Sequence, residues 1–221
     1  MAKKGNKIPI VDEVSDTIIG NSLKYLKEIV IEYARGGHSI LFAGAPGVGK
    51  ELFADLYAAA TQREIHPINM TGIPANLIES ILFGHVKGAF TDATKDKDGH
   101  ITKKNMPKLC FFFDELGDIP SDLQAKLLRF VQFGEIQKVG KTEPIKIDPK
   151  QLRIVAASNK PECIRDDLKD RFKCLRIPTL VERYHDIPEL MKHFLEDPAV
   201  TGITEYTLNG VSNIVLVEDE Y

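Results

Sequence analysis

The chain has 221 residues, of which 43% are hydrophobic and 28% charged, and its formal net charge is −3. This composition is ordinary for a globular protein with a sizeable core, and the slightly acidic charge argues against a large nucleic-acid-binding surface. The sequence has no apolar run of about eighteen residues and no signal peptide, so we expect a cytoplasmic protein without a membrane span. The three cysteines (Cys110, Cys163 and Cys174) lack a CxxC spacing and predict free thiols.

Hydrophobic periodicity predicts strands that alternate with helices along the chain. In order, we expect a helix at 21–35, a strand at 39–44, a helix at 49–60, a strand at 65–70, a helix at 75–83, a long loop at 84–108, a strand at 109–113, a helix capped by Ser121, a hairpin at 134–148, strands at 152–158 and 174–178, and a helix at 182–196. This alternation predicts an α/β fold in which a parallel sheet has helices on both faces. We expect a domain boundary near residue 178, between a larger α/β domain (1–178) and a partial or divergent helical lid subdomain (179–221).

The stretch GAPGVGKE (44–51) matches the phosphate-loop pattern G-x-x-x-x-G-K between a predicted strand and a predicted helix. Glycines allow backbone N–H groups to surround an anion, the helix N-terminus attracts negative charge, and the lysine reaches the outer phosphates. Glu51 occupies the position where the pattern usually has a Ser or Thr that ligates Mg²⁺. The predicted nucleotide-binding residues here are Gly44, Ala45, Pro46, Gly47, Val48, Gly49, Lys50, Glu51 and Leu52.

FFFDE (111–115) ends a predicted buried strand with two carboxylates. Asp114 is placed to hold Mg²⁺ against the phosphates, and Glu115 to orient and deprotonate the attacking water. An Asp-Glu pair by itself would be read as a solvated turn. The phosphate loop upstream favours ATP hydrolysis instead.

Four further polar residues are candidates for the same site. Asn69 and Asn159 each end a predicted strand, where parallel sheets form their ligand crevice, although either could be an ordinary turn residue. Arg165 and Arg171, in IRDDLKDRF, could be arginine fingers that act on a neighbouring subunit's nucleotide or members of a solvated, salt-bridged helix face.

These motifs, in this order, resemble the AAA+ ATPase domain of bacterial enhancer-binding proteins, which activate sigma-54 RNA polymerase. The resemblance runs from IIGNS (18–22) to ERYHDIPEL (182–190) and implies that Ile19 and Gly20 also belong to the nucleotide site. The family's phosphate loop ends in GKE, so Glu51 fits it. RDDLKDR has both arginines at the family's spacing.

The stretch ESILFGHVKGAFTDA (79–93) resembles the family's ESxLFGHxKGAFTGA. The resemblance implies a mobile loop whose Phe90 and Thr91 contact the sigma factor, within a partner-binding segment formed by Gly88, Ala89, Phe90, Thr91, Asp92 and Ala93. It also implies an exposed Phe90 and a Glu115 that pairs with Asn69 in one nucleotide state. Asp92 replaces the family's second glycine and places a charge at the contact tip.

The resemblance therefore implies an ATP- and Mg²⁺-dependent motor that remodels sigma-54 closed complexes as a ring, a hexamer in this family. DNA contact would come only through a domain outside this chain, because no helix-turn-helix is visible. The family's GNxREL lid stretch is not found either. Two alternatives stay open: a nucleotide-dependent binding module with little turnover, and an AAA+ ATPase that has diverged to remodel another protein.

Overall fold

The computed structural model describes residues 9–102, 104, 106–196, 207–208 and 211–212. Its helices are α1 (Val11–Thr17), α2 (Lys24–Arg35), α3 (Lys50–Ala60), α4 (Ala75–Phe83), α5 (Ser121–Phe133), α6 (Asp166–Lys169) and α7 (Ile187–Glu196). Its strands are β1 (Ile40–Ala43), β2 (Glu64–Asn69), β3 (Gly84–His85), β4 (Lys97–Asp98), β5 (Leu109–Asp114), β6 (Glu135–Ile136), β7 (Ile145–Lys146), β8 (Ile154–Ser158), β9 (Lys173–Arg176), β10 (Thr207–Leu208) and β11 (Val211–Ser212). No helix within these ranges is long and apolar enough to cross a membrane.

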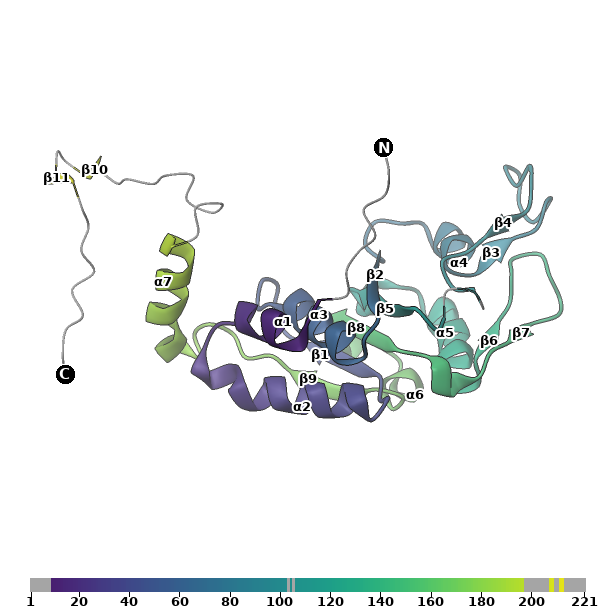
Figure 1. Ribbon diagram of the computed structural model, residues 1–221. Helices are drawn as coiled ribbons and strands as arrows, with labels where there is room; N and C mark the ends of the chain where they lie inside the picture. Colours follow the sequence, from purple (N-terminus) through teal and green to yellow (C-terminus); the bar gives the residue numbers. More distant parts are fainter. Residues whose placement is uncertain (1–8, 103, 105, 197–206, 209–210, 213–221) are drawn as a thin grey trace, which may run out of the picture.

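A five-stranded parallel sheet with the order β2-β5-β8-β1-β9 forms the centre of the molecule (Figure 1). β2 lies at one edge, and this position explains how the strand tolerates Pro67, since proline cannot donate a hydrogen bond to a neighbouring strand. The predicted α/β fold is confirmed.

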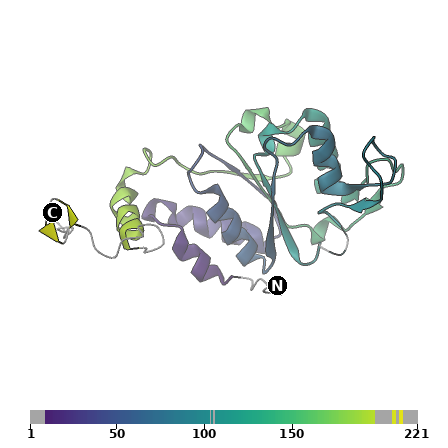
Figure 2. The same cartoon turned by 90° about the horizontal axis from the view of Figure 1, so that it is seen from above.

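Helices cover both faces of the sheet (Figure 2). Successive side chains of a strand point to opposite faces, so Phe111 and Phe113 enter one core and Phe112 enters the other. α4 and α5 contribute to the first core, and α1, α2 and α3 to the second. Because β1, β5 and β8 are buried on both faces, these three strands are mostly apolar, which explains the runs seen in the sequence, whereas the edge strands β2 and β9 are more exposed and more polar.

Two small hairpins and α7 extend from this core. The β3–β4 and β6–β7 hairpins lie at one end of the molecule, and α7 lies at the other (Figure 1). β3 and β4 fall within 84–108, which was predicted as a loop, and pair over only two residues each. The 134–148 hairpin was predicted correctly, and its Val139 bonds to the β3 segment.

Two predicted helix starts were wrong. Pro120, in an extended conformation, is the N-cap of α5, so Ser121 is already the first helical residue and its side chain does not cap. The predicted 182–196 helix starts only at Ile187, after a short 3-10 turn at Tyr184–Asp186. Helix α1, with only Val11 and Val14 as apolar residues, was not predicted at all.

Candidate nucleotide-binding and hydrolysis site

The phosphate-loop residues connect β1 to α3 at the carboxyl end of the sheet. Gly47 and Gly49 have φ of +77° and +99°, a region that side chains with a Cβ enter only at an energetic cost. Gly49 is the N-cap of α3, so the first N–H groups of that helix remain free to bind an anion. The strand–loop–helix arrangement expected around residues 44–51 is present.

Lys50 lies over this loop and points towards the neighbouring strand end. Its side chain is only 8% exposed, and its Nζ donates to the carbonyl oxygens of Gly44 (3.0 Å) and Ala45 (3.2 Å). The same Nζ lies 4.0 Å from Glu115 Oε1. A buried ammonium between two carbonyls and a carboxylate can transfer its hydrogen bonds to a phosphate without a large movement.

Asp114 is the last residue of β5 and Glu115 follows it, between the strand ends of β2 and β8. Glu115 has φ +53° and ψ +50°, a left-handed conformation uncommon for residues other than glycine. This turn lets the Glu115 N–H donate to Asp114 Oδ1 (3.1 Å), while Glu115 Oε2 accepts from the N–H of Asn159 (3.1 Å). The backbone strain at Glu115 thus fixes its carboxylate beside Lys50 and β8.

Carboxylates concentrate beside the phosphate loop. Burial raises the pKa of Asp114, and the charge of Glu51 raises it further. Burial and then the charge of Glu51 likewise raise the pKa of Asp55. This excess of negative charge suits a divalent cation. The described residues contain no set of three or more side chains able to hold a metal by themselves, so Mg²⁺ would depend on phosphates and water as additional ligands.

The two asparagines flank this pair of carboxylates. Asn69 lies opposite Asp114 in the β2–β5 register, and its Oδ1 accepts from the N–H of Thr71 (2.7 Å). Asn159 follows β8, and its Oδ1 is buried without a hydrogen-bond partner. In this conformation Glu115 therefore bonds to the backbone of Asn159, and Asn69 bonds locally.

A cavity of about 380 Å³ lies next to the phosphate loop. It is lined by Thr17, Ile18, Ile19, Leu23, Gly47, Val48, Gly49, Leu52, Phe53, Leu180, Arg183, Leu190, His193 and Phe194. The walls are mostly apolar, as expected for a site that binds a planar base. Five of the predicted nucleotide-binding residues contribute to it, namely Ile19, Gly47, Val48, Gly49 and Leu52. Gly20 is instead buried against Asp186.

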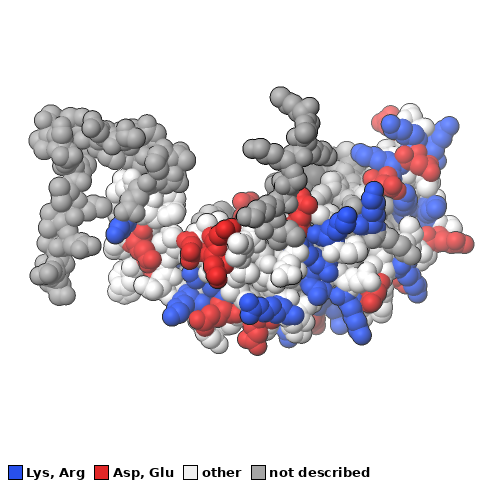
Figure 3. Space-filling model, in the orientation of Figure 1, with Lys and Arg blue, Asp and Glu red and all other residues white. Residues whose placement is uncertain are grey.

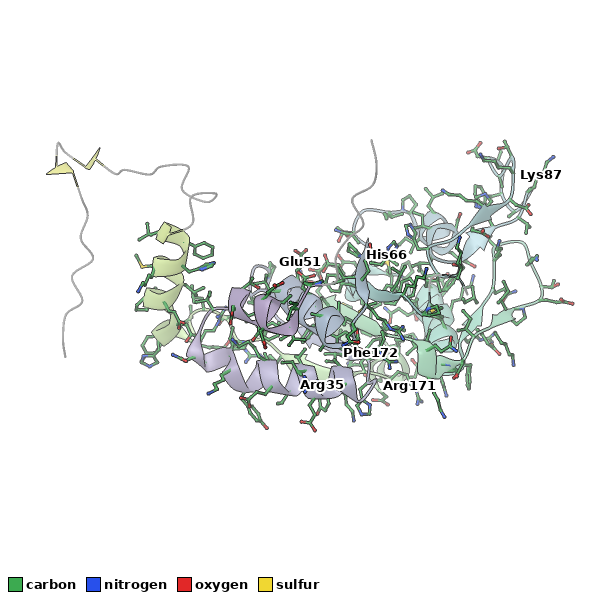
Figure 4. All side chains as sticks on the ribbon, viewed as in Figure 1. Arg35, Glu51, His66, Lys87, Arg171 and Phe172 are labelled. Atoms are coloured by element: carbon green, nitrogen blue, oxygen red, sulfur yellow. The ribbon has the colours of Figure 1, made fainter. Side chains whose placement is uncertain are left out.

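The two candidate arginines lie outside this cluster. Arg165 pairs with Asp167 (2.6 Å), which lowers the pKa of that carboxyl, and also donates to Ser121 Oγ. Arg171 is exposed and lines a separate cavity that includes His38. Figure 4 shows Arg171 on the lower side of the molecule and Glu51 on the upper side. In this conformation Arg165 is thus engaged by Asp167 and Ser121, and Arg171 lies on the opposite side of the molecule from Glu51.

Residues 88–93 form the tip of the β3–β4 hairpin. The N–H of Gly88 donates to the carbonyl of Ala93 (2.8 Å), closing the tip. Thr91 and Asp92 are exposed, but Phe90 is half-buried and packs edge-on against His85, with ring centroids 4.9 Å apart. The expectation of an exposed Phe90 was therefore wrong, because the buried His85 gives the ring a partner within the chain.

The second hairpin supports this tip. A Cβ on Gly140 would crowd Val86 and Ala89, so the two hairpins approach closely. Asp92 keeps a negative φ, since Gln62 and Glu115 are the non-glycine residues with positive φ in the described part of the chain. On the face shown in Figure 3, basic and acidic side chains alternate over both hairpins, without a broad field of one sign.

Sequence reasoning missed three buried polar residues. Gln124 bonds to the carbonyls of Ile119 and Cys163 and accepts from the N–H of Arg165, so it positions the segment that contains that arginine. Arg183 and Asp186 are buried next to the cavity. Arg183 and Asp186 lie in ERYHDIPEL (182–190), a stretch that the family resemblance included, and this resemblance was the sequence signal that could have identified them.

Comparison with known proteins agrees with this geometry. Residues 18–176 match the family model described as the sigma-54 interaction domain. The DNA-binding transcriptional regulator NtrC is 38% identical in Proteus hauseri (86% of this chain, 42% of the relative) and 39% identical in Escherichia coli K12 (76% and 37%). The Nif-specific regulatory protein of Rhizobium leguminosarum bv. trifolii is 38% identical over 81% of this chain and 53% of its own length.

Among solved structures, NtrX from Brucella abortus superposes with a TM-score of 0.67 at 26% identity, over 87% of this chain and 46% of that chain. NtrX in complex with ADP has a TM-score of 0.65 at 24% identity, over 91% of this chain and 45% of that chain. The chain thus spans about half the length, or less, of the relatives it matches. Since the family model covers most of the chain, the protein belongs to the sigma-54 interaction domain family, the AAA+ motor domains of sigma-54-dependent transcriptional activators.

Proposed function

We propose that this chain is a Mg²⁺-dependent ATPase domain that uses hydrolysis to remodel sigma-54 RNA polymerase closed complexes. The observation that carries the proposal is the position of Glu115. Its carboxylate lies beside the phosphate-loop lysine and is held by the backbone of Asn159, at the edge of the sheet where a γ-phosphate would lie. A base held there can act on a water only if a phosphate is bound in front of it.

In this mechanism the chain's own groups position the reactants. The N–H groups of residues 44–49 and the first turn of α3 bind the phosphates, and Lys50 leaves its two carbonyl partners to contact the outer ones. Glu115 accepts a proton from the attacking water, and Asn159 offers its unpartnered amide oxygen to that water. Asp114, with Glu51 nearby, would hold Mg²⁺, which neutralises charge on the phosphates.

Residues 88–93 are the proposed contact with sigma-54. Thr91 and Asp92 are already exposed, and Phe90 has only to leave His85 to reach a partner. The domain would act in the cytoplasm as a ring, a hexamer as the family resemblance implies, with Arg165 and Arg171 reaching a neighbouring subunit's nucleotide. DNA would be bound only by another domain. We also propose that a helical lid subdomain begins near residue 179. The part of the chain where the family's GNxREL stretch would be expected lies outside the described residues.

A second candidate is an AAA+ motor that acts on a different protein. The exposed carboxylate of Asp92 favours it, because a charge at the contact tip changes which surface the tip can bind.

The test of the proposed function is ATP hydrolysis and ATP binding by the wild type and two variants. Lys50→Ala should lose nucleotide binding, because it removes the only lysine that reaches the phosphate loop in the described structure. Glu115→Gln should keep ATP affinity and lose turnover by about 100-fold or more, as expected for removal of a general base. Unchanged turnover in Glu115→Gln would remove its assigned role, and unchanged affinity in Lys50→Ala would remove the phosphate-loop assignment.

A further inference from the structure

Arg183 and Asp186 form a buried ion pair that the proposed chemistry does not use. Their residues are 8% and 2% exposed, and Arg183 Nη1 lies 3.7 Å from Asp186 Oδ2. Burying two charges is unfavourable unless hydrogen bonds satisfy most of their polar atoms. The pair therefore needs an explanation in terms of what it holds.

Asp186 holds the N-terminal wall of the cavity. Its Oδ1 accepts from both the N–H (3.2 Å) and the Oγ (3.0 Å) of Ser22, a residue 164 positions away in the sequence. A Cβ on Gly20 would overlap the Asp186 carboxylate, so the backbone of residues 19–22 lies directly against it. This contact fixes the segment that carries Ile19 into the cavity.

Arg183 connects that wall to the phosphate loop. Its guanidinium donates to the carbonyls of Ile19 (3.4 Å) and Val48 (3.5 Å), two residues that line the cavity from different segments. Both contacts are longer than the usual 2.9–3.0 Å for such bonds. In addition, Arg183 Nε and Asp186 Oδ2 are buried without a hydrogen-bond partner. The ion pair thus contacts both the Ile19 and the Val48 wall of the cavity, and two of its polar atoms, Arg183 Nε and Asp186 Oδ2, still lack a hydrogen-bond partner.

The pair also lies at the start of α7. This helix begins directly after Asp186 and places Leu190, His193 and Phe194 in the same cavity. Arg183 and Asp186 thus connect Ile19 and Val48 to the first residue of a helix that lines the cavity.

We propose that Arg183, anchored by Asp186, is a positioning residue for the nucleoside part of the ligand. Arg183 sets the distance between the cavity walls formed by Ile19 and Val48. A base bound between these walls shortens the hydrogen bonds of Arg183 to the two carbonyls and holds α7 in place. Arg183 does not contribute to phosphate binding. This inference rests on the proposed nucleotide binding and assigns a positioning residue to the cavity that would hold the base.

The test compares two ligands, ATP and inorganic tripolyphosphate, each with Mg²⁺, by calorimetric titration. Tripolyphosphate occupies the phosphate loop but leaves the base cavity empty. Arg183→Met should weaken ATP binding by about tenfold or more, equivalent to the loss of one or two hydrogen bonds, and should change tripolyphosphate binding by less than about twofold. Arg183→Lys should recover part of the loss, and Asp186→Asn should give an intermediate loss for ATP alone.

The matched control is Arg176→Met, which removes an exposed arginine paired with Glu182 shortly before Arg183 in the chain. It should leave both affinities unchanged. A second readout is hydrogen exchange of the α7 amides: ATP should slow it in the wild type, but not in Arg183→Met, and tripolyphosphate should slow it in neither.

Equal weakening of both ligands by Arg183→Met would overturn the inference, since it would mean that the residue only supports the phosphate loop. Unchanged ATP affinity would also overturn it. If Arg183→Met does not fold, Arg183→Lys and Asp186→Asn decide by the same comparison. A wild type that binds neither ligand would overturn the proposed function itself, a result visible before any variant is compared.

Discussion

Asn159 combines a backbone contact to Glu115 with a buried side-chain oxygen that lacks a hydrogen-bond partner. An unsatisfied buried carbonyl costs about 1–3 kcal/mol. Functional sites are where such costs are tolerated, because the free group is completed by substrate.

Asn159→Ala should therefore separate stability from turnover. The backbone bond to Glu115 remains, so the free energy of unfolding should stay the same or rise by about 1 kcal/mol. ATP turnover should fall at least tenfold, because the amide no longer orients the water. Chemical denaturation and steady-state ATPase assays measure both quantities. A loss of stability larger than about 1 kcal/mol would show that the side chain is structural.

The positions of the candidate site residues were predictable where a motif combined with a strand end. Lys50 was placed by the phosphate-loop pattern, and Asp114, Glu115 and Asn159 were placed from short apolar runs followed by polar residues. Parallel strands necessarily bring their carboxyl ends to one edge. The left-handed conformation of Glu115 could not be predicted, because no local pattern distinguishes it from an ordinary strand end.

At the scale of elements, the long apolar strands were predictable and the weakly patterned pieces were not. β5 and β8 are buried on both faces, so their sequences carry the signal directly. α1 has too few turns to show a period, and β3 and β4 depend on pairing with each other and with Val139. Phe90 was misjudged for the same reason, since its partner His85 belongs to that hairpin.

The imidazoles of His66 and His100 connect the edge strand β2 to the segment after the β3–β4 hairpin. His66 Nε2 and His100 Nδ1 are 2.6 Å apart. Burial lowers the pKa of His66, the positive charge of His100 lowers it further, and Glu64 opposes the shift. Two positively charged imidazolium rings at this distance would repel each other.

Acidification should therefore weaken the fold through this pair. Since the pKa of His66 is lower in the folded state, the unfolded chain binds more protons below about pH 6.5, and stability should fall from there towards the folded pKa. His100→Asn should raise the pKa of His66 part of the way to its ordinary value, because burial remains. Histidine NMR titration measures the pKa directly, and a pKa of His66 unaffected by the variant would contradict the assigned coupling.

At the scale of the whole molecule, the proposed ring requires the two arginines to act on a neighbouring subunit's nucleotide. Arg171 is exposed and far from the phosphate loop, and Arg165 is held by an exposed ion pair that is readily exchanged. Both guanidinium groups are thus accessible from outside the chain, which the ring proposal requires.

A mixing experiment tests this arrangement. Arg171→Ala and Lys50→Ala should each lose ATPase activity by more than about 100-fold when assayed alone, the first for lack of the finger and the second for lack of phosphate binding. A mixture should recover part of the activity, because an intact phosphate loop from one variant meets an intact Arg171 from the other. If the mixture stays inactive while Arg171→Ala still assembles, Arg171 does not act between subunits.

In the proposed mechanism, the hairpin tip (residues 88–93) contacts the partner protein. Asp92 has a negative φ, so the backbone does not require glycine at this position, and the residue affects binding through its charge and size. We therefore expect Asp92→Gly to leave the fold unchanged and the ATPase rate of the isolated domain within about twofold of the wild type.

Complex formation with sigma-54 in the presence of ADP and aluminium fluoride, measured by gel filtration, should then distinguish the two proposed partners. Trapping by the wild type and the variant alike means that the charge is tolerated and sigma-54 is the partner. Trapping by the variant alone means that Asp92 excludes sigma-54 by its unpaired charge, and that the intact motor acts on a different protein whose surface offers that carboxylate a cation.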